Sequence, residues 1–361
     1  MNKRFNKYIV FWIVLLFIIL LGTGVCLFLN NPSFGSIPSG ERLERILLSP
    51  NFIDGKFHNQ IPTPMMTGDR NRCQALLDFV FGNHKGLRPD KAVPVVQTDL
   101  KHLPQESNLM VWFGHSSYLL QLEGKKILVD PVFYMASPVS FVNTPFVGTD
   151  IFHSDDMPEI DLLVITHDHW DHLDYKTVKE LRGKIGKVIC PLGVGAHFEY
   201  WGYNKKMLVE LDWNEQVHYD NLIIHCLPAR HFSGRGLSSN KTLWGSFLIE
   251  SPSQTLFLSG DGGYGPHFKE IGTRFPKIDW AILENGQYNE DWKYIHTMPR
   301  QLKQVIFDLN TKNTITVHHS KYALSNHSWD EPLKNARLLN ERDSLNVLVP
   351  TIGEIILLKN N

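Results

Sequence analysis

The segment Asp161-Leu-Leu-Val-Ile165-Thr-His167-Asp-His169-Trp-Asp171-His172 is the most informative part of this sequence. Its first residues are mainly branched apolar side chains, which predict a short buried strand. Four potential metal ligands follow at once: His167, His169, Asp171 and His172. Loops that leave the carboxyl ends of strands commonly carry the chemistry of α/β proteins. The segment therefore predicts a metal-binding loop at the end of a strand.

The spacing inside this loop suggests two metal ions. Side chains at alternate positions of an extended chain point the same way, so His167 and His169 can hold one ion. Asp171 and His172 begin the next turn and can face a second ion. The alternative is a solvated polar loop before a helix, but so dense a group of His and Asp is not expected from composition alone.

Two metal sites need more ligands than one loop supplies. Three other strand-like runs lead to candidates: Leu222–Cys226 before His231, Thr255–Leu258 before Asp261, and Thr314–Val317 before His318. A single strand-end His is more often a structural residue, yet these three complete a ligand set. An Asp between two cations is apt because it neutralises their charge. His319 is the alternative to His318, which we favour because it ends the strand.

The remaining pattern favours a layered α/β domain from Asn108 onward. Further strand-like runs are expected at Leu109–Phe113, Tyr118–Leu122, Lys126–Val129, Lys187–Cys190, Ser246–Ile249, Trp280–Leu283 and Leu345–Val349. Helical stretches at Tyr175–Leu181 and Pro299–Asn310 lie between some of them. Hairpin-like strands followed by alternating strands and helices are typical of an α/β layered fold.

A membrane anchor is predicted at the amino terminus. The run Tyr8–Leu29 holds no charged residue and, at about 1.5 Å per residue, is long enough to cross a bilayer as a helix. It is too long for a cleaved signal peptide, and Gly22-Thr23-Gly24 is a poor cleavage site. Positive residues before the run keep the amino terminus cytoplasmic, which places residues 31–361 outside, in a periplasm or at the cell surface.

The chain thus divides into three parts. Residues 1–30 form the anchor, 31–107 an irregular extension that packs on the catalytic domain, and 108–361 the catalytic domain. Turn residues dominate the extension, with short helices expected at Arg42–Leu48 and Cys73–Phe81.

Composition and the lack of certain motifs argue against several alternatives. The 36 basic and 37 acidic residues nearly cancel, which argues against a nucleic-acid partner. The four cysteines form no CxxC pair, so neither a thiolate zinc site nor a disulfide scaffold is indicated. The sequence has no GxSxG elbow and no GxxxxGK[ST] loop, which removes serine hydrolysis and P-loop chemistry.

The order HxHxDH, then His, Asp and His, resembles that of the metallo-β-lactamase superfamily, across roughly residues 108–355. The resemblance implies a four-layer αββα sandwich with two divalent ions, expected to be Zn²⁺, at the mouth between two sheets. It implies one site from His167, His169 and His231, a second from Asp171, His172 and His318, and Asp261 as the bridge. A β-lactamase proper is disfavoured because those enzymes usually present Cys where Asp261 stands.

Several motifs look closer to the N-acylphosphatidylethanolamine-hydrolysing phospholipase D branch, in a bacterial, membrane-anchored form. They include Trp112-Phe-Gly-His115, Leu128-Val-Asp130-Pro-Val-Phe133, Pro228-Ala-Arg-His231-Phe-Ser, Tyr294-Ile-His296-Thr-Met-Pro299 and Val317-His318-His-Ser-Lys-Tyr322. This branch implies a phospholipid substrate. His296 resembles a position near the substrate phosphate and is assigned a catalytic role.

Other polar residues are interpreted individually. Asp130 either orients a ligand histidine or forms a turn before Pro131. His115 is expected to pack or to make a buried hydrogen bond, and Asp174 to cap the helix at Tyr175. No role is assigned to His197, His267 or His327.

The predicted function is a metal-dependent phosphodiesterase on N-acylphosphatidylethanolamine or a related phospholipid. Two bound ions can lower the pKa of a shared water to near neutrality, and Asp171 could orient the resulting hydroxide. A lactonase or ester hydrolase on the same centre is the first alternative, and a metal-binding module without turnover is the second. The expected partners are a small-molecule or phospholipid substrate, the membrane and, by analogy, a second copy in a homodimer.

Overall fold

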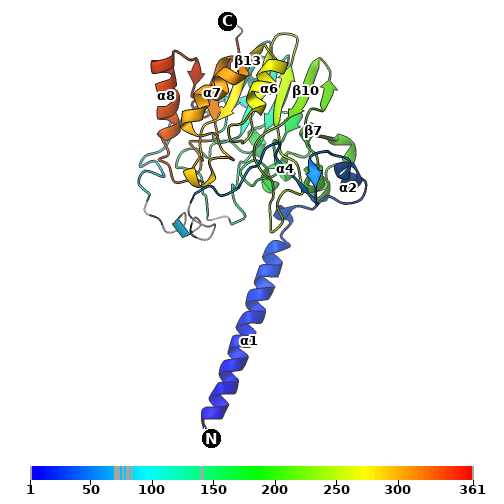
Figure 1. Cartoon of the computed structure of the whole chain (residues 1–361), viewed down its shortest axis with the longest axis vertical. Helices are drawn as coiled ribbons and strands as arrows, with labels where there is room; N and C mark the ends of the chain where they lie inside the picture. The colour runs from blue at the N-terminus through cyan, green and yellow to red at the C-terminus, as the bar shows by residue number, and fades with distance from the viewer. Residues whose placement is uncertain are drawn as a thin grey trace.

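The computed structural model describes residues 2–68, 74, 77, 78, 82, 84–139 and 142–359. Two seven-stranded mixed sheets lie face to face, with helices on their outer sides (Figure 1). One long helix projects from this folded part, hereafter the head. The predicted four-layer αββα sandwich, preceded by an apolar amino-terminal helix, is confirmed.

The first sheet holds the strands around the opening motif. Its order is β16 (Ile355–Leu357), β3 (Leu109–Trp112), β4 (Tyr118–Leu122), β5 (Lys125–Val129), β6 (Ile160–Val164), β7 (Ile185–Pro191) and β8 (Leu208–Leu211). Strands β5 to β8 pair in parallel, while β3 and β4 form antiparallel pairs. The ends of β3, β5 and β6 therefore meet at one edge of the sheet.

The second sheet holds the strands of the carboxyl-terminal half. Its order is β15 (Val347–Leu348), β14 (Thr311–Val317), β13 (Ile278–Glu284), β12 (Thr255–Leu258), β11 (Ser246–Glu250), β10 (Leu222–Leu227) and β9 (Gln216–Tyr219). Strands β12 to β15 are parallel, and β10 runs the same way because two antiparallel pairings separate it from β12. The ends of β10, β12, β13 and β14 share one edge.

Alternating side chains build two hydrophobic layers around the second sheet. Leu256 and Leu258 point into the main core between the sheets, whereas Phe257 points to the outer face. That outer face is covered by α6 (His267–Arg274), α7 (Pro299–Leu309) and α8 (Glu331–Asp343). On the other side, α4 (Tyr175–Leu181) and α5 (Gly195–Tyr200) contribute Leu181 and Phe198 to the main core.

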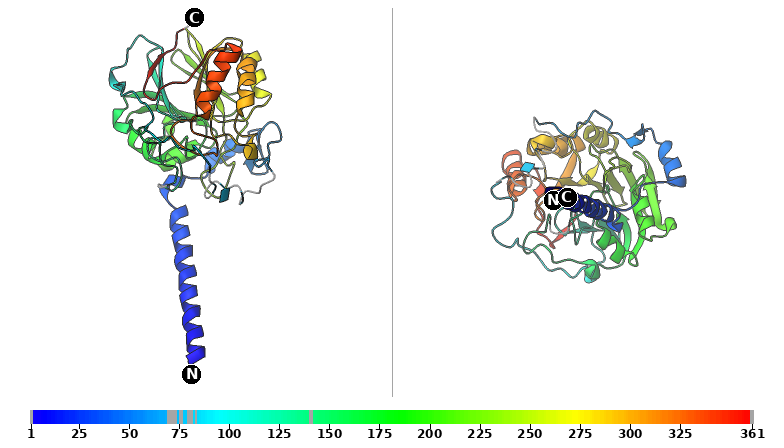
Figure 2. Two further views of the ribbon diagram at one scale, coloured as in Figure 1. Left: turned by 90° about the vertical axis from the view of Figure 1, so that its left-hand side faces the viewer. Right: turned by 90° about the horizontal axis from the view of Figure 1, so that it is seen from below.

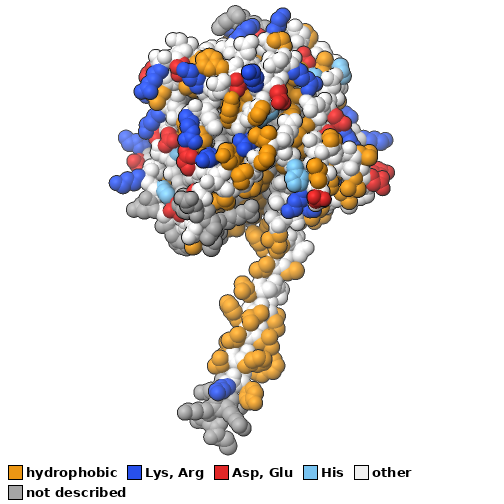
Figure 3. All heavy atoms as spheres, viewed as in Figure 1, with side chains coloured by type: hydrophobic (Ala, Val, Ile, Leu, Met, Phe, Trp, Pro, Cys, Tyr) orange, Lys and Arg blue, Asp and Glu red, His pale blue; other side chains and the backbone are white. Residues whose placement is uncertain are grey.

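Helix α1 (Asn2–Leu29) extends away from the head, as the side view in Figure 2 also shows. Residues Lys7–Leu29 are apolar enough to cross a membrane, and none of this stretch is buried against the rest of the protein. Hydrophobic side chains cover the helix on the face seen in Figure 3. By length and composition α1 is a candidate membrane span, a property that it shares with signal sequences.

The extension between α1 and the sheets is largely irregular. It contains η1 (Pro32–Phe34), α2 (Gly40–Leu47), the two-stranded sheet β1 (Phe52–Ile53) with β2 (Lys56–Phe57), and η2 (Leu100–His102). Helix α2 starts two residues before the prediction and ends one earlier. The predicted helix at Cys73–Phe81 lies largely outside the described residues. Three short turns of helix complete the described structure: η3 (Ser154–Asp156), η4 (Lys205–Met207) and η5 (Glu290–Trp292).

Candidate metal centre

The candidate ligands gather where the ends of the two sheets meet. The loop that follows β6, residues 165–173, is hereafter the ligand loop; it carries His167, His169, Asp171 and His172. Its end is fixed by Asp174, which accepts hydrogen bonds from the backbone N–H groups of Lys176 and Thr177, so the predicted helix cap is confirmed. His231, Asp261 and His318 arrive from the ends of β10, β12 and β14.

Three histidines form the first group. Nε2 of His167 lies 2.9 Å from Nδ1 of His169, and Nε2 of His231 lies 3.2 Å from the same atom. Ligands held at about 2.0–2.1 Å around a tetrahedral ion are separated by roughly 3.3 Å. The three nitrogens are thus spaced as ligands of a single ion would be.

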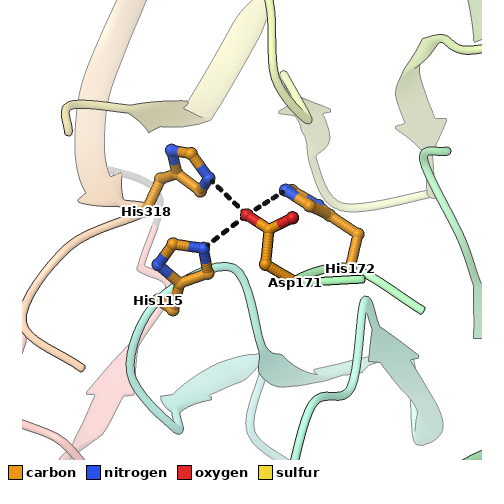
Figure 4. Close-up of side chains that lie close together, drawn as sticks. All are labelled: His115, Asp171, His172 and His318. Carbon is orange, nitrogen blue, oxygen red and sulfur yellow. Dashed lines mark hydrogen bonds and ion pairs between the residues drawn. The ribbon is translucent and has the colours of Figure 1, made fainter. Parts of the chain in front are cut away.

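The second group surrounds the carboxylate of Asp171. Its Oδ2 atom lies 2.8 Å from Nε2 of His115, 3.3 Å from Nε2 of His318 and 3.6 Å from Nε2 of His172 (Figure 4). All three imidazoles are buried. The buried His115 therefore makes a hydrogen bond, one of its two expected roles, and its partner is a candidate ligand.

Asp261 lies between the two groups. Its Oδ2 atom is 3.1 Å from Nε2 of His172, 3.2 Å from Nε2 of His318 and 3.9 Å from Nε2 of His231. The backbone before Asp261 packs closely against the ligand loop because residue 260 is glycine. A Cβ at Gly260 would lie 2.8 Å from the side chain of Thr166. The position of Asp261 is the one that a bridging carboxylate needs.

The carboxylates of Asp171 and Asp261 are held ionised. Burial alone would raise the pKa of Asp171, but His172 and hydrogen bonds from His115 and His318 outweigh it and hold that pKa well below its ordinary value. The pKa of Asp261 is also held well below its ordinary value, since His172 and His318 outweigh burial. Ionised carboxylates are the form that binds metal ions.

The histidines of the two groups have different surroundings. Burial lowers the pKa of His167 and His231 well below the ordinary value, and that of His169 to about 4. Burial would also lower the pKa of His172, but Asp261, Asp171 and Asp130 raise it well above the ordinary value. The first group therefore offers neutral imidazoles, and the second lies in a negative field that favours a cation.

These residues fit a pair of divalent cations. Within the described part of the chain, Nε2 of His172 and Oδ1 of Asp261 are buried polar atoms that make no hydrogen bond. Such atoms are costly unless a partner satisfies them. A His-rich set with carboxylates is the donor chemistry of Zn²⁺ and related metals.

Asp130 orients the ligand loop. Its carboxylate accepts hydrogen bonds from Nδ1 of His172 at 2.8 Å, from the Thr166 hydroxyl at 2.6 Å and from the Thr166 backbone N–H at 2.8 Å. The contact with Nδ1 leaves Nε2 of His172 directed at Asp261. This geometry supports the orienting role over the simple turn. Nδ1 of His231 is fixed in the same manner by the carbonyl of Ile295, at 2.7 Å.

His318 and His319 point in different directions. Nε2 of His318 faces Asp171 and Asp261, as described above. The His319 ring packs 4.9 Å from the ring of Trp112 and hydrogen-bonds Ser320 at 2.8 Å. The structure therefore brings only His318 of this pair to the other candidate ligands.

Glu284, at the end of β13, is a site residue that sequence reasoning missed. Its Oε2 accepts from Nδ1 of His296 at 2.7 Å, and its Oε1 accepts from the backbone N–H groups of Gly262 and Thr297. Burial would lower the pKa of His296, but Glu284 and Asp261 raise it. The raised pKa favours the protonated, cationic form of His296. This residue, expected near the substrate, lies beside the candidate ligands.

Three residues of the site have strained backbone conformations. His115, Asp130 and His318 all have positive φ, at 53°, 42° and 69°. The backbone N–H of His115 donates to the carbonyl of His319, and that of His318 donates to the carbonyl of His115, both at 2.9 Å. These bonds hold the β3 and β14 ends together across the two sheets, which offsets the strain.

A pocket of about 470 Å³ opens onto the candidate ligands. Its polar base includes His169, Asp171, His231, Asp261, His296 and His318. Apolar side chains make up much of the rest of its lining, namely Met65, Met66, Phe232, Trp292, Ile295 and Leu324, and the polar residues Ser239, Asn240 and Gln287 complete it. Met65 and Met66 belong to the extension, so residues before the sheets help to shape this pocket.

The three histidines without an assigned role lie outside the ligand groups found among the described residues. His267 is buried in α6, and His327 accepts a hydrogen bond from the backbone N–H of Gln287. His197 instead contacts Asp168 of the ligand loop at 3.1 Å, a contact that its place in the sequence did not suggest.

Known proteins are similar to this chain in sequence and in fold. The family model of the Beta-lactamase superfamily domain matches residues 125–319. An uncharacterized protein of Mycobacterium tuberculosis is 35% identical over 311 residues, which cover 85% of this chain and 84% of that protein. N-acyl-phosphatidylethanolamine-hydrolyzing phospholipase D 1 of Caenorhabditis elegans is 30% identical over 266 residues, covering 67% of this chain and 74% of that protein.

Among solved structures, a metallo hydrolase from the archaeon Ignicoccus hospitalis superposes with a TM-score of 0.52 at 19% identity. The match covers 69% of this chain and 97% of that one. The chain belongs to the metallo-β-lactamase superfamily and is a metal-dependent hydrolase of it. Its relatives include N-acylphosphatidylethanolamine-hydrolysing phospholipases D.

Proposed function

We propose that this protein is a two-metal phosphodiesterase that cleaves N-acylphosphatidylethanolamine or a related phospholipid in the manner of a phospholipase D. One observation carries the proposal: five of the candidate ligands line a pocket to which six apolar side chains also contribute. An amphipathic substrate would place its phosphate at the candidate ligands and its acyl chains against the apolar side chains. The similarity to phospholipases D supports the same choice of substrate.

In this proposal one ion would be held by His167, His169 and His231 and the other by Asp171, His172 and His318, with Asp261 available to both. Two divalent ions, of which Zn²⁺ fits these donors best, would supply hydroxide at neutral pH and stabilise charge on the attacked phosphate. A purely structural zinc site would be closed by four ligands, whereas five of these donors, His169, Asp171, His231, Asp261 and His318, line an open pocket.

Two side chains of the chain itself would act on the substrate. Asp171 lines the pocket, and its carboxylate can accept a hydrogen bond from the attacking water and so orient it. His296 also lines the pocket, and Glu284 holds its Nδ1–H, which leaves Nε2 for a phosphate oxygen. A protonated His296 would stabilise the charge that develops there.

The anchor would keep the enzyme at its substrate. We propose that α1 spans the membrane with its amino terminus in the cytoplasm and the hydrolase domain outside. Alkaline phosphatase fused after residue 361 should then be active, and a fluorescent protein that folds only in the cytoplasm should remain dark. The reverse pattern would invert the proposed orientation.

The enzymatic test uses the full chain in detergent. Wild type should contain about two metal ions and release phosphatidic acid from N-acylphosphatidylethanolamine, whereas His169→Ala and Asp261→Ala should lose both properties. His102→Ala, at an exposed position, is the control. Two ions with cleavage of lactones but not of phosphodiesters would favour a lactonase. Bound metal without any turnover would leave a metal-binding module.

A further inference from the structure

Arg235 connects the ligand loop to the segment that follows α1. Its side chain is buried, with 4% exposed. One terminal nitrogen donates to the backbone carbonyls of Asp168 at 2.8 Å and Leu173 at 2.6 Å. Nε and the other terminal nitrogen both donate to the carbonyl of Ser33, at 3.1 and 2.9 Å. The guanidinium thus joins two points of the ligand loop, Asp168 and its last residue Leu173, to residues 30–37, hereafter the juxtamembrane segment.

A second connection runs through the side chain of Asp168, between the candidate ligands His167 and His169. Its Oδ2 accepts from Nε2 of His197 at 3.1 Å, and Nδ1 of His197 accepts from the backbone N–H of Ser36 at 3.0 Å. The chain passes close to this ring only because residue 35 is glycine, since a Cβ there would lie 2.0 Å from Nδ1 of His197.

Aromatic side chains add a third connection. Trp170 of the ligand loop packs against Phe34 at 5.0 Å, and Phe34 packs against Phe28 of α1 at 5.2 Å. The Trp201 indole donates to the carbonyl of Pro32 at 2.7 Å. A single ring, that of Phe34, therefore separates the end of α1 from the ligand loop.

A tether that only kept the enzyme near a membrane would need none of these contacts. Here the contacts of Arg235 and His197 converge on the backbone and side chain of Asp168, whose two neighbours in the chain are candidate ligands. Trp170 and Trp201 contact the juxtamembrane segment directly. A displacement of the juxtamembrane segment would pull on the carbonyl of Asp168 through Ser33 and Arg235, and on its carboxylate through His197.

We infer that the juxtamembrane segment is a structural part of the metal centre, with Arg235, His197 and Trp201 as the positioning residues that fix the ligand loop to the end of α1. This inference rests on the proposed metal centre. Groups that orient metal ligands from outside typically change metal affinity 10- to 100-fold when removed. The juxtamembrane segment should therefore influence metal binding, although it supplies no ligand.

The test compares Trp201→Phe with Trp213→Phe in the full-length protein. Both tryptophans are 5% exposed, and each donates one indole hydrogen bond to a backbone carbonyl, of Pro32 and Trp244 respectively. Only the first of these bonds reaches the juxtamembrane segment. Arg235→Lys is the second variant, because it keeps the charge but loses the planar fork that contacts three carbonyls.

Zn²⁺ affinity is measured by competition with a chromophoric chelator, the visible spectrum of the Co²⁺ form reports ligand geometry, and Tm reports stability. We expect Trp201→Phe and Arg235→Lys to lower Zn²⁺ affinity about tenfold and to alter the Co²⁺ spectrum. Trp213→Phe should lower Tm only.

Wild-type affinity and spectrum in both variants, with Tm lowered as in Trp213→Phe, would overturn the inference and leave the proposed function intact. A wild-type protein that binds no metal would overturn both. Because the two results differ in the wild type itself, the failure of one proposal is distinguishable from the failure of the other.

Discussion

Nε2 of His115 lies 2.8 Å from Oδ2 of Asp171, and the same histidine exchanges backbone hydrogen bonds with the His318–His319 turn. Burial and the nearby His318 lower the pKa of His115 to about 3, so its imidazole is neutral and donates the Nε2–H. His115 therefore holds two candidate ligands from different sheets in place.

The first prediction concerns this contact. His115→Phe keeps a ring against His318 but removes the donor to Asp171, so Zn²⁺ affinity should fall about tenfold or more. Competition with a chelator measures the change. The matched control is His225→Phe, since His225 is also buried and bonded to a carboxylate, Glu250, at 2.6 Å. Equal metal affinity in wild type and His115→Phe would refute the role.

The second prediction separates the neighbouring histidines. His318→Ala should lose about one metal ion per chain, because its Nε2 faces both Asp171 and Asp261. His319→Ala should keep both ions and unfold at lower temperature, because it removes packing against Trp112. Metal analysis and thermal unfolding distinguish the two variants, and loss of metal in His319→Ala alone would reverse the assignment.

The third prediction addresses catalysis. His296→Gln should lower kcat about 100-fold with the metal content unchanged, since this side chain lines the pocket but is not one of the proposed ligands. Glu284→Gln should have a smaller effect in the same direction, because a neutral partner no longer favours the charged imidazole. Steady-state kinetics with a metal assay provide the test, and a normal kcat in His296→Gln would remove this residue from the mechanism.

The fourth prediction concerns stability and pH. Burial lowers the pKa of His267 to about 4, whereas the unfolded chain has the ordinary value of about 6.5. The unfolded state then binds more protons between these values, so stability falls as pH drops below 6.5, by about 2 kcal/mol at pH 5. His267→Phe should weaken this loss in denaturant titrations at pH 7 and pH 5. His102→Phe, at an exposed site, should leave the pH dependence unchanged.

Local signals made the ligand loop predictable. The strand before it and its four His and Asp residues are adjacent in sequence, and β4, β12 and α4 were predicted with correct bounds. Strands β8, β9 and β16 were not predicted, because they are only three or four residues long and lie at the sheet edges, where so short a run gives little periodic signal.

Glu284 could not be found in the same way. It ends the buried run Ile278–Glu284, and its importance comes from the position of β13 between β12 and β14, which only the sheet order reveals. The contact between His197 and Ser36 spans 161 residues, a separation at which sequence patterns carry no signal. The candidate ligands were therefore easier to predict than the residues that hold them in place.

The short aromatic path Phe28–Phe34–Trp170 has a kinetic consequence. If α1 spans a bilayer as proposed, the ligand loop would be held close to the lipid surface, because only the Phe34 ring lies between Trp170 and Phe28. Encounters with a lipid then become a two-dimensional search, and turnover should follow the mole fraction of substrate in the surface. Diluting vesicles at constant composition would leave the rate per enzyme unchanged, whereas adding inert lipid to the same bilayer would lower it.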